Sequence, residues 1–356
     1  MDENRHRARG RAALSNAPGR YERHDREAVD DGWARDDDLP PLRTEVAVER
    51  PRKVITRNAS PDVPFDRSVN PYRGCEHGCI YCFARPTHAR LGLSPGLDFE
   101  TRLIARPGAA EALARELARP GYRVAPIAIG TNTDPYQPIE GDWRVMRQLL
   151  EVLAAHRHPV QIVTKGTLIE RDLGLLREMA AERLVQVGIS VTTLDRKVAR
   201  AMEPRVPGPA QRLRTIERLA GAGVPVRVMV SPVVPALTDH EVEAILRAGA
   251  RAGARAAGYI VLRLPLEVAG LFRDWVEAEF PDRAARIMGR VREVHGGQEY
   301  DPHWGRRMTG QGKWAELLSQ RFDLARRRHG LARDLPGLRC DLFAVPARVG
   351  DQLSLF

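Results

Sequence analysis

The sequence predicts an α/β protein whose centre is a partial (β/α)6 barrel. Short apolar runs of strand length alternate with stretches of helical spacing through the middle of the chain, which is typical of βα units around a parallel sheet. With one strand placed before a cysteine-rich turn, about six such units can be counted. Polar residues follow the ends of several strands, where parallel βα folds hold their ligands.

The expected elements follow one another in a regular order. The extended stretch "PFDRSVNPYRG" supplies the first strand, directly before the cysteines. Runs such as "VAPIAIG" and "PVQIVTKG" are short, apolar and closed by glycine, which is typical of buried strands. Segments such as "PAQRLRTIERLAGAG" have helical spacing and end at glycine. We expect strands at 124–130, 159–166, 183–191, 224–235 and 257–265, and helices at 141–156, 168–182, 209–223 and 239–253.

The chain divides into a core and three flanking regions. Residues 1–55 hold 12 basic and 12 acidic residues without apolar periodicity, so we expect a disordered arm there. We place the barrel core at 56–265, a helical and basic region at 266–343 and a flexible tail at 344–356. No stretch approaches the ~20 apolar residues that cross a bilayer, and the N-terminus lacks an apolar run of signal-peptide type. We therefore expect a cytoplasmic protein without membrane contact.

The formal net charge is +10, which raises the question of a polyanionic partner. Of the 56 basic residues only four are lysine, and so general an arginine bias inflates positive charge everywhere. The excess is nevertheless local, because residues 281–340 hold 13 basic and 7 acidic residues. This region is therefore a candidate for contact with nucleic acid.

Three of the four cysteines lie in "GCEHGCIYC", residues 74–82. Cytoplasmic cysteines stay reduced, so a tight cluster indicates metal binding or redox chemistry rather than disulfides. In one interpretation Cys75, Cys79 and Cys82 bind three irons of a 4Fe-4S cluster and leave the fourth iron open. In a second, they form a zinc site with His88 or His77. In a third, they form a redox-active cysteine patch.

The C-x3-C-x2-C spacing, with Tyr81 before the last cysteine and a run of βα units behind it, resembles the radical S-adenosylmethionine superfamily. The resemblance covers about residues 60–265. It implies a 4Fe-4S cluster on Cys75, Cys79 and Cys82, and S-adenosylmethionine bound to the open iron. It also implies an external electron donor, because reductive cleavage of the sulfonium yields a 5′-deoxyadenosyl radical that abstracts hydrogen from a substrate.

Within that superfamily, "NPYRGCEHGCIYCFARPTH", "FETRLIARPG", "TNTDPYQPIE", "IVTKG" and "GISVTT" resemble the spore photoproduct lyase-like branch. The resemblance places Tyr81 at the cofactor, Lys165 at its carboxylate and Ser190 within hydrogen-bonding reach of it. It places Asn132 and Asp134 near its amino end or ribose. It also favours action on DNA in a lyase-like or repair reaction.

One position departs from the branch. Spore photoproduct lyases carry a cysteine that returns a hydrogen atom to the repaired product, and Thr131 stands in its place here. A hydroxyl O–H bond is much harder to break homolytically than a thiol S–H bond, so Thr131 does not take over that task. Cys340 could do so only if the C-terminal region folds over the site.

The C-terminal "QLSLF", residues 352–356, resembles the peptide with which bacterial replication and repair proteins dock on the sliding clamp. Such a peptide binds in extended form, its alternate side chains filling pockets. We therefore expect Gln352, Leu353, Ser354, Leu355 and Phe356 to bind the clamp. Three functions stay open at this point: radical chemistry on DNA, radical chemistry on RNA, a peptide or a metabolite, and a non-catalytic iron–sulfur scaffold at the replication fork.

Overall fold

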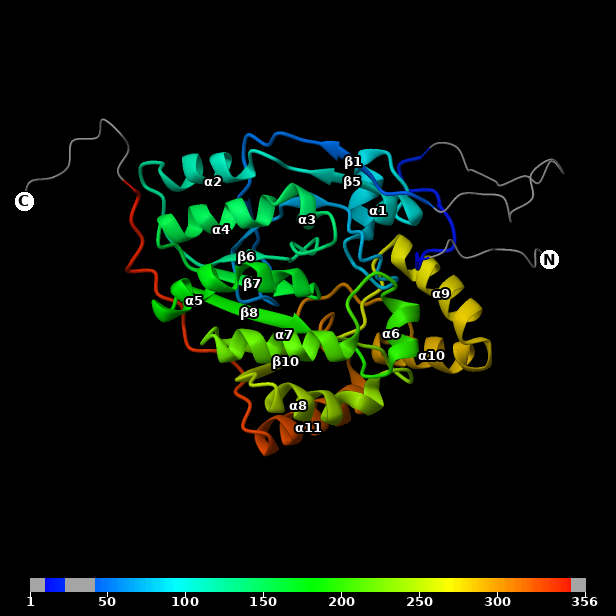
Figure 1. The fold of residues 1–356 in the computed structure, drawn as a ribbon. Coiled ribbons are helices and arrows are strands. Elements are labelled where there is room, and N and C mark those ends of the chain that lie inside the picture. The colour runs from blue at the N-terminus through cyan, green and yellow to red at the C-terminus, as the bar shows by residue number, and fades with distance from the viewer. Residues whose placement is uncertain (1–9, 23–41, 347–356) are drawn as a thin grey trace, which may run out of the picture.

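The computed structural model describes residues 10–22 and 42–346. Within these residues, six parallel strands form the centre of the fold (Figure 1). A short antiparallel strand, β2, closes one edge of the sheet beside β3. The sheet order is β10 (Ala256–Val261), β9 (Val226–Val233), β8 (Val185–Ser190), β7 (Val160–Thr164), β6 (Ile127–Ile129), β3 (Arg67–Val69) and β2 (Thr56–Arg57). This order confirms the partial (β/α)6 barrel.

Amphipathic helices cover the outer face of the sheet (Figure 1). They are α4 (Val145–Ala155), α5 (Leu173–Ala181), α7 (Pro209–Gly221) and α8 (Val242–Arg251). Each turns its apolar side to the strands, as α4 does with Leu149, Leu150 and Leu153. The expected helix 168–182 begins as the 3-10 turn η3 (Thr167–Asp172), and a short helix, α6 (Arg196–Met202), follows β8 where none was expected.

The connection from β3 to β6 carries the cysteine loop. It contains β4 (Tyr72–Arg73), η2 (Arg85–Leu91), α1 (Leu97–Thr101), β5 (Arg102–Ala105) and α2 (Ala109–Leu117). The strands β4 and β5 form a separate small sheet with β1 (Glu45–Val48). Since β3 runs parallel to β6, this connection starts at the carboxyl ends of the strands, which we call the mouth.

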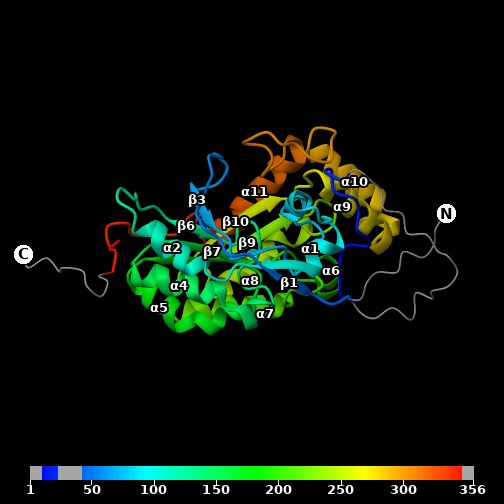
Figure 2. The ribbon, with the colours of Figure 1, turned by 90° about the horizontal axis from the view of Figure 1, so that it is seen from above.

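The C-terminal region is largely helical, with α9 (Glu267–Glu279), α10 (Pro281–Val294) and α11 (Gly312–Arg328). Figure 2 shows these helices gathered on the side of the sheet away from α4, α5 and α7. Phe322 of α11 packs on Tyr259 of β10 with ring centroids 4.7 Å apart. A second apolar cluster, which includes Trp275 and Met202, lies beneath Cys79.

The N-terminal region departs from the expected disordered arm in the parts that are described. Residues 45–48 form β1, which pairs with β5. Arg11 is 1% exposed, and its guanidinium donates to the carbonyl of Glu100 at 2.7 Å. Residues 10–22 therefore form a strap over the cysteine loop, because buried hydrogen bonds hold a segment that has too few apolar residues to fold alone.

Residues 336–344 run along the opposite end of the barrel. Arg339 donates its backbone N–H to the carbonyl of Arg183, just before β8, and Ala344 donates to that of His156, before β7. In Figure 1 this segment lies at the tail of the β8 arrow. The tail residues expected to bind the clamp lie outside the described residues. Among the described residues, no helix is long and apolar enough to cross a membrane.

Candidate cofactor site

The three predicted cluster ligands lie on one tight loop between β4 and η2. Cys75 and Cys79 are 6% and 7% exposed, Cys82 is half-buried, and all three are free thiols. The loop turns at Gly78, whose φ is +65° and where a Cβ would lie 2.6 Å from a carboxylate oxygen of Glu100. Glycine is therefore required at this turn both for its backbone angle and for its lack of a side chain.

A buried ion pair holds the loop from behind. Arg85 and Glu100 are both fully buried and lie 2.5 Å apart. The Arg85 guanidinium also donates to the backbone carbonyls of Cys79 at 3.0 Å and Gly78 at 3.1 Å. The strap of residues 10–22 adds two backbone N–H donors to the Glu100 carboxylate. The loop is thus fixed before any ligand binds, which is what a preorganised site needs.

The donor set fits an iron–sulfur cluster better than a single zinc ion. Burial raises the pKa of the Cys79 thiol to about 12, so a metal must supply the charge that stabilises its thiolate. Among the described residues, no group of three or more His, Cys, Asp or Glu side chains is placed to hold one metal ion. His88 is already engaged, since its Nε2 lies 2.9 Å from the carbonyl of Arg102. In a cubane each cysteine binds its own iron, so the sulfurs need not converge on one point.

A half-buried cation, Lys165, lies beside these thiols. The Lys165 ammonium lies 5.8 Å from the centroid of the Tyr81 ring and forms no hydrogen bond within the described chain. The Tyr81 hydroxyl donates to the Glu203 carboxylate, which also accepts from Thr192 at 2.7 Å and pairs with Arg212 at 2.5 Å. Burial by itself lowers the pKa of Lys165, but the Cys79 sulfur, Glu203 and Asp134 outweigh it and raise that pKa. Lys165 is therefore positively charged and has no hydrogen-bond acceptor among the described residues.

Asp134 holds the loop that follows β6. Its carboxylate accepts from the Thr164 hydroxyl at 2.5 Å, the Lys165 amide at 2.7 Å and the Tyr136 amide at 2.9 Å. Burial by itself raises its pKa, but His77 and the hydrogen bonds from Thr164 and Lys165 outweigh it and lower the pKa to about 2. Asp134 thus positions the backbone of Lys165, a task that the sequence did not predict. Its contact with the cofactor stays a prediction.

Ser190 and Asn132 lie at the same rim. Ser190 is the last residue of β8 and is 3% exposed, and its carbonyl accepts from Arg212 at 3.0 Å. Its hydroxyl forms no hydrogen bond with a described residue. Asn132 follows β6, where its backbone N–H donates to Asn70 at 3.3 Å. The carboxyl ends of β6, β7 and β8 therefore bring Asn132, Lys165 and Ser190 to neighbouring positions, as expected; their roles stay predictions.

The residue in place of the lyase cysteine, Thr131, and its possible substitute, Cys340, lie at opposite ends of the barrel. Thr131 follows β6 at the mouth and is half-buried. Cys340 lies between Arg339 and Asp341, in the segment that is bonded to residues before β7 and β8. That segment is at the amino ends of the strands, so Cys340 does not fold over the cysteine loop and does not replace the missing lyase cysteine.

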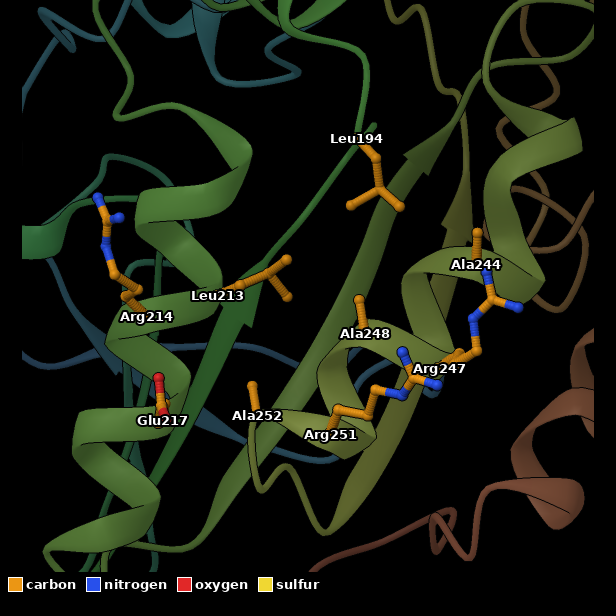
Figure 3. A pocket seen from close by; sticks show the side chains of 9 residues that line it. All are labelled: Leu194, Leu213, Arg214, Glu217, Ala244, Arg247, Ala248, Arg251 and Ala252. Atoms are coloured by element: carbon orange, nitrogen blue, oxygen red, sulfur yellow. The ribbon is translucent and has the colours of Figure 1, made fainter.

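A hollow of about 390 Å³ lies elsewhere, between α7 and α8 on the outside of the barrel (Figure 3). Its floor is apolar, with Leu194, Leu213 and Ala248, and its rim carries Arg214 and Arg251. These helices cover the outer face of the sheet, so the hollow is separate from the cysteine loop.

Comparison with known proteins agrees with the site. The family model for the radical SAM superfamily matches residues 69–248, about half of the chain. The chain belongs to the radical SAM superfamily. An uncharacterized protein of Mycobacterium tuberculosis is 40% identical over 242 residues, which is 67% of this chain and 70% of that protein. An uncharacterized protein of Methanocaldococcus jannaschii is 24% identical over 49% of this chain and 62% of its own length.

Solved structures of spore photoproduct lyase share the fold of this radical SAM protein. A mutant form of that lyase with bound AdoMet and dinucleoside spore photoproduct matches with a TM-score of 0.56 and 17% identity, over 80% of each chain. Another mutant form of the lyase matches with a TM-score of 0.55 over the same shares. The cofactors of the superfamily are a 4Fe-4S cluster and S-adenosylmethionine, and the cysteine loop and the free cation of Lys165 suit them.

Sequence reasoning missed the residues that hold the site from behind. Two buried ion pairs cannot be recognised from a local sequence motif: Arg85 pairs with Glu100, and Arg212 pairs with Glu203. In a chain so rich in arginine and glutamate, such residues look like ordinary surface charges until their partners are known.

Proposed function

We propose that this radical SAM enzyme acts on DNA in a lyase-like or repair reaction. The observation that carries the enzyme assignment is the Lys165 ammonium, which is half-buried beside three free thiols and has no hydrogen-bond acceptor in the described chain. Support for DNA comes from the excess of arginine in residues 281–340 and from the shared fold with spore photoproduct lyase, a protein solved with a dinucleoside photoproduct.

The chain's own residues bind and orient the cofactor. The three cysteines hold the cluster, Lys165 neutralises the carboxylate of S-adenosylmethionine, and Ser190 offers a free hydroxyl to it. When both cofactors are bound, a cluster reduced by an external electron donor would supply one electron for cleavage of S-adenosylmethionine, and so the means for hydrogen abstraction from a substrate. The Arg85–Glu100 pair keeps the loop in place, and the apolar cluster beneath Cys79 keeps water away from it.

Thr131 favours a second candidate, radical chemistry other than photoproduct reversal. Since Cys340 lies at the far end of the barrel, the described residues offer no thiol besides the cluster ligands at the mouth. A reaction on RNA, a peptide or a metabolite that needs no thiol hydrogen donor is compatible with this mouth. The iron–sulfur scaffold is the third candidate.

An anaerobic turnover experiment distinguishes the three candidate functions. The reconstituted protein is reduced with dithionite in the presence of S-adenosylmethionine, with and without ultraviolet-irradiated DNA, and 5′-deoxyadenosine and altered nucleosides are measured. The proposal expects 5′-deoxyadenosine that rises with irradiated DNA, together with altered lesions. If 5′-deoxyadenosine forms equally with and without irradiated DNA, the substrate is RNA, a peptide or a metabolite. If the wild-type protein contains the cluster, Cys79→Ala loses it, and still no 5′-deoxyadenosine forms, the result favours the scaffold.

We also propose that Gln352–Phe356 docks the enzyme on the sliding clamp. Deletion of residues 352–356 is expected to abolish binding to purified clamp while 5′-deoxyadenosine formation is unchanged, because the segment 336–344 that leads to this tail lies at the end of the barrel away from the mouth. Unchanged clamp binding by the deletion variant would remove this part of the proposal.

A further inference from the structure

The guanidinium of Arg263 lies at the mouth of the barrel, against the ring of Phe83. Arg263 follows β10, and its guanidinium carbon is 4.4 Å from the centroid of the Phe83 ring, next to Cys82. Burial lowers the pKa of Arg263, and Tyr300, Arg307, Asp62 and Cys82 are its electrostatic neighbours. Within the described chain, no hydrogen bond or ion pair engages this guanidinium.

Two other arginines of the 301–308 turn are paired. Arg307 lies 2.5 Å from Asp62, and Arg306 lies 3.2 Å from Asp301. Arg263 is thus a half-buried guanidinium that no anion of the described chain engages by a hydrogen bond, and its partial desolvation favours the binding of an anion. A guanidinium in this state fits a phosphate or carboxylate, whose oxygens it can meet with two parallel hydrogen bonds.

An aromatic side chain stands on the same rim. Trp304 is 60% exposed, although the backbone that carries it is fixed. The N–H of Gly305 donates to Asp62 at 2.7 Å, and the N–H of Val261 in β10 donates to the carbonyl of Met308 at 2.8 Å. A large exposed ring on a fixed turn suits stacking on a flat ligand, because little conformational entropy is lost when the ligand binds.

We propose that Arg263 and Trp304 form the substrate-binding rim of the mouth, with a phosphate of a single-stranded DNA segment on Arg263 and a base stacked on Trp304. This inference rests on the proposed action on DNA and names the surface that would serve it. Asp62 lies near both residues, because it accepts a hydrogen bond from Gly305, the residue after Trp304, and is an electrostatic neighbour of Arg263. Phe83, which is 44% exposed and directly follows Cys82, places this rim beside the cluster ligands.

The test measures binding of a short fluorescein-labelled single-stranded oligodeoxynucleotide to the full-length, cluster-loaded protein by fluorescence anisotropy at several salt concentrations. Arg263→Gln and Trp304→Ala are each expected to weaken binding about tenfold. Only Arg263→Gln should reduce the slope of log K against log salt, by about 0.7 for one lost phosphate contact on a single strand. Arg263→Lys should recover part of the affinity.

Arg177→Gln is the matched control, since Arg177 is an exposed arginine of α5 on the outer face of the barrel, outside the basic region 281–340. It should change the affinity less than about twofold, as expected for a charge without a defined phosphate contact. The same unlabelled sequence made as RNA serves as competitor, and stronger competition than by DNA would overturn the choice of DNA.

The outcomes separate the surface from the function. If both Arg263→Gln and Trp304→Ala bind the oligodeoxynucleotide with wild-type affinity, the proposed substrate-binding rim is wrong. Loss of S-adenosylmethionine affinity in Arg263→Gln would also overturn it, because the guanidinium would then belong to the cofactor. If the wild type binds DNA through this rim but DNA leaves 5′-deoxyadenosine formation unchanged, the proposed binding surface is supported and the proposed reaction on DNA is contradicted. If the wild type binds no DNA, the proposed binding surface and the proposed reaction on DNA are both contradicted.

Discussion

A tyrosine hydroxyl, a buried carboxylate and an arginine occur together twice in this protein, in two neighbouring networks. In the cluster-side network, Tyr81 donates to Glu203, which pairs with Arg212. In the loop network, which holds the segment after β6, Tyr136 donates to Asp172 at 3.1 Å and Arg171 pairs with it at 2.9 Å. Their chemical parts are therefore nearly the same.

The networks differ in whether every charge has a partner. In the loop network Arg171 also pairs with Glu140 at 2.6 Å, and Glu140 accepts from Tyr72 as well. The cluster-side network has one cation more, Lys165, for which the described chain supplies no hydrogen bond. A closed network stabilises the fold, and an open one leaves charge for a ligand. The comparison teaches that the residual charge, rather than burial or an ion pair as such, marks the site.

The largest effect should be common to both networks. Arg171→Met and Arg212→Met each leave a buried carboxylate without its main cation, so each should lower the free energy of unfolding by about 3–5 kcal/mol. Urea unfolding of the purified proteins measures this, with Arg328→Met as the exposed control. If Arg212→Met costs less than about 1 kcal/mol, Lys165 already neutralises Glu203 and the cluster-side network is closed after all.

Lys165→Gln should separate the networks most clearly. The loss of a charge-assisted bond to the S-adenosylmethionine carboxylate, worth about 2–3 kcal/mol, predicts about 30- to 150-fold weaker binding. The free energy of unfolding should stay within about 1 kcal/mol of wild type, because the substitution orphans no described hydrogen-bond partner. Equilibrium dialysis of the reconstituted protein gives the affinity. Unchanged affinity would assign the carboxylate to another group.

The sequence could predict what is local or repeated. The cysteines lie within nine residues, and their spacing together with the resemblance to the radical S-adenosylmethionine superfamily predicts the cluster. The order of strands and helices also predicts that Lys165 and Ser190 lie at one rim. It could not predict the pairing of Glu203 with Arg212, because both residues look like surface charges until α7 folds onto β8. It also missed the strap, since composition predicts disorder where Arg11 in fact binds the carbonyl of Glu100.

Glu203→Gln tests the electrostatic link between the two cations of the cluster-side network. Glu203 helps to raise the pKa of Lys165, so its neutralisation should lower that pKa. Affinity that depends on the charged ammonium is complete below this pKa and is lost as the pH rises through it. In Glu203→Gln the loss of S-adenosylmethionine affinity should therefore begin at lower pH than in the wild type, which equilibrium dialysis over a pH series measures.

Glu140→Gln is the counterpart in the loop network. It should destabilise the protein, because Glu140 accepts from the backbone N–H groups of Met146 and Arg147 as well as pairing with Arg171. The pH dependence of S-adenosylmethionine binding should follow the wild type. A shift of equal size in both variants would show that the effect comes from general loss of structure.

The smallest effects concern the two hydroxyls. Tyr81→Phe and Tyr136→Phe each remove one buried hydrogen bond and should lower the free energy of unfolding by about 1 kcal/mol. Neither should change S-adenosylmethionine binding more than about threefold, because Tyr81→Phe keeps the ring that faces the Lys165 ammonium. Tyr81→Leu removes that ring as well and should weaken binding a further two- to fivefold, equivalent to about 0.5–1 kcal/mol. If Tyr81→Phe already weakens binding as much as Lys165→Gln, the hydroxyl itself must reach the cofactor, and the division between a closed and an open network would have to be redrawn around Tyr81.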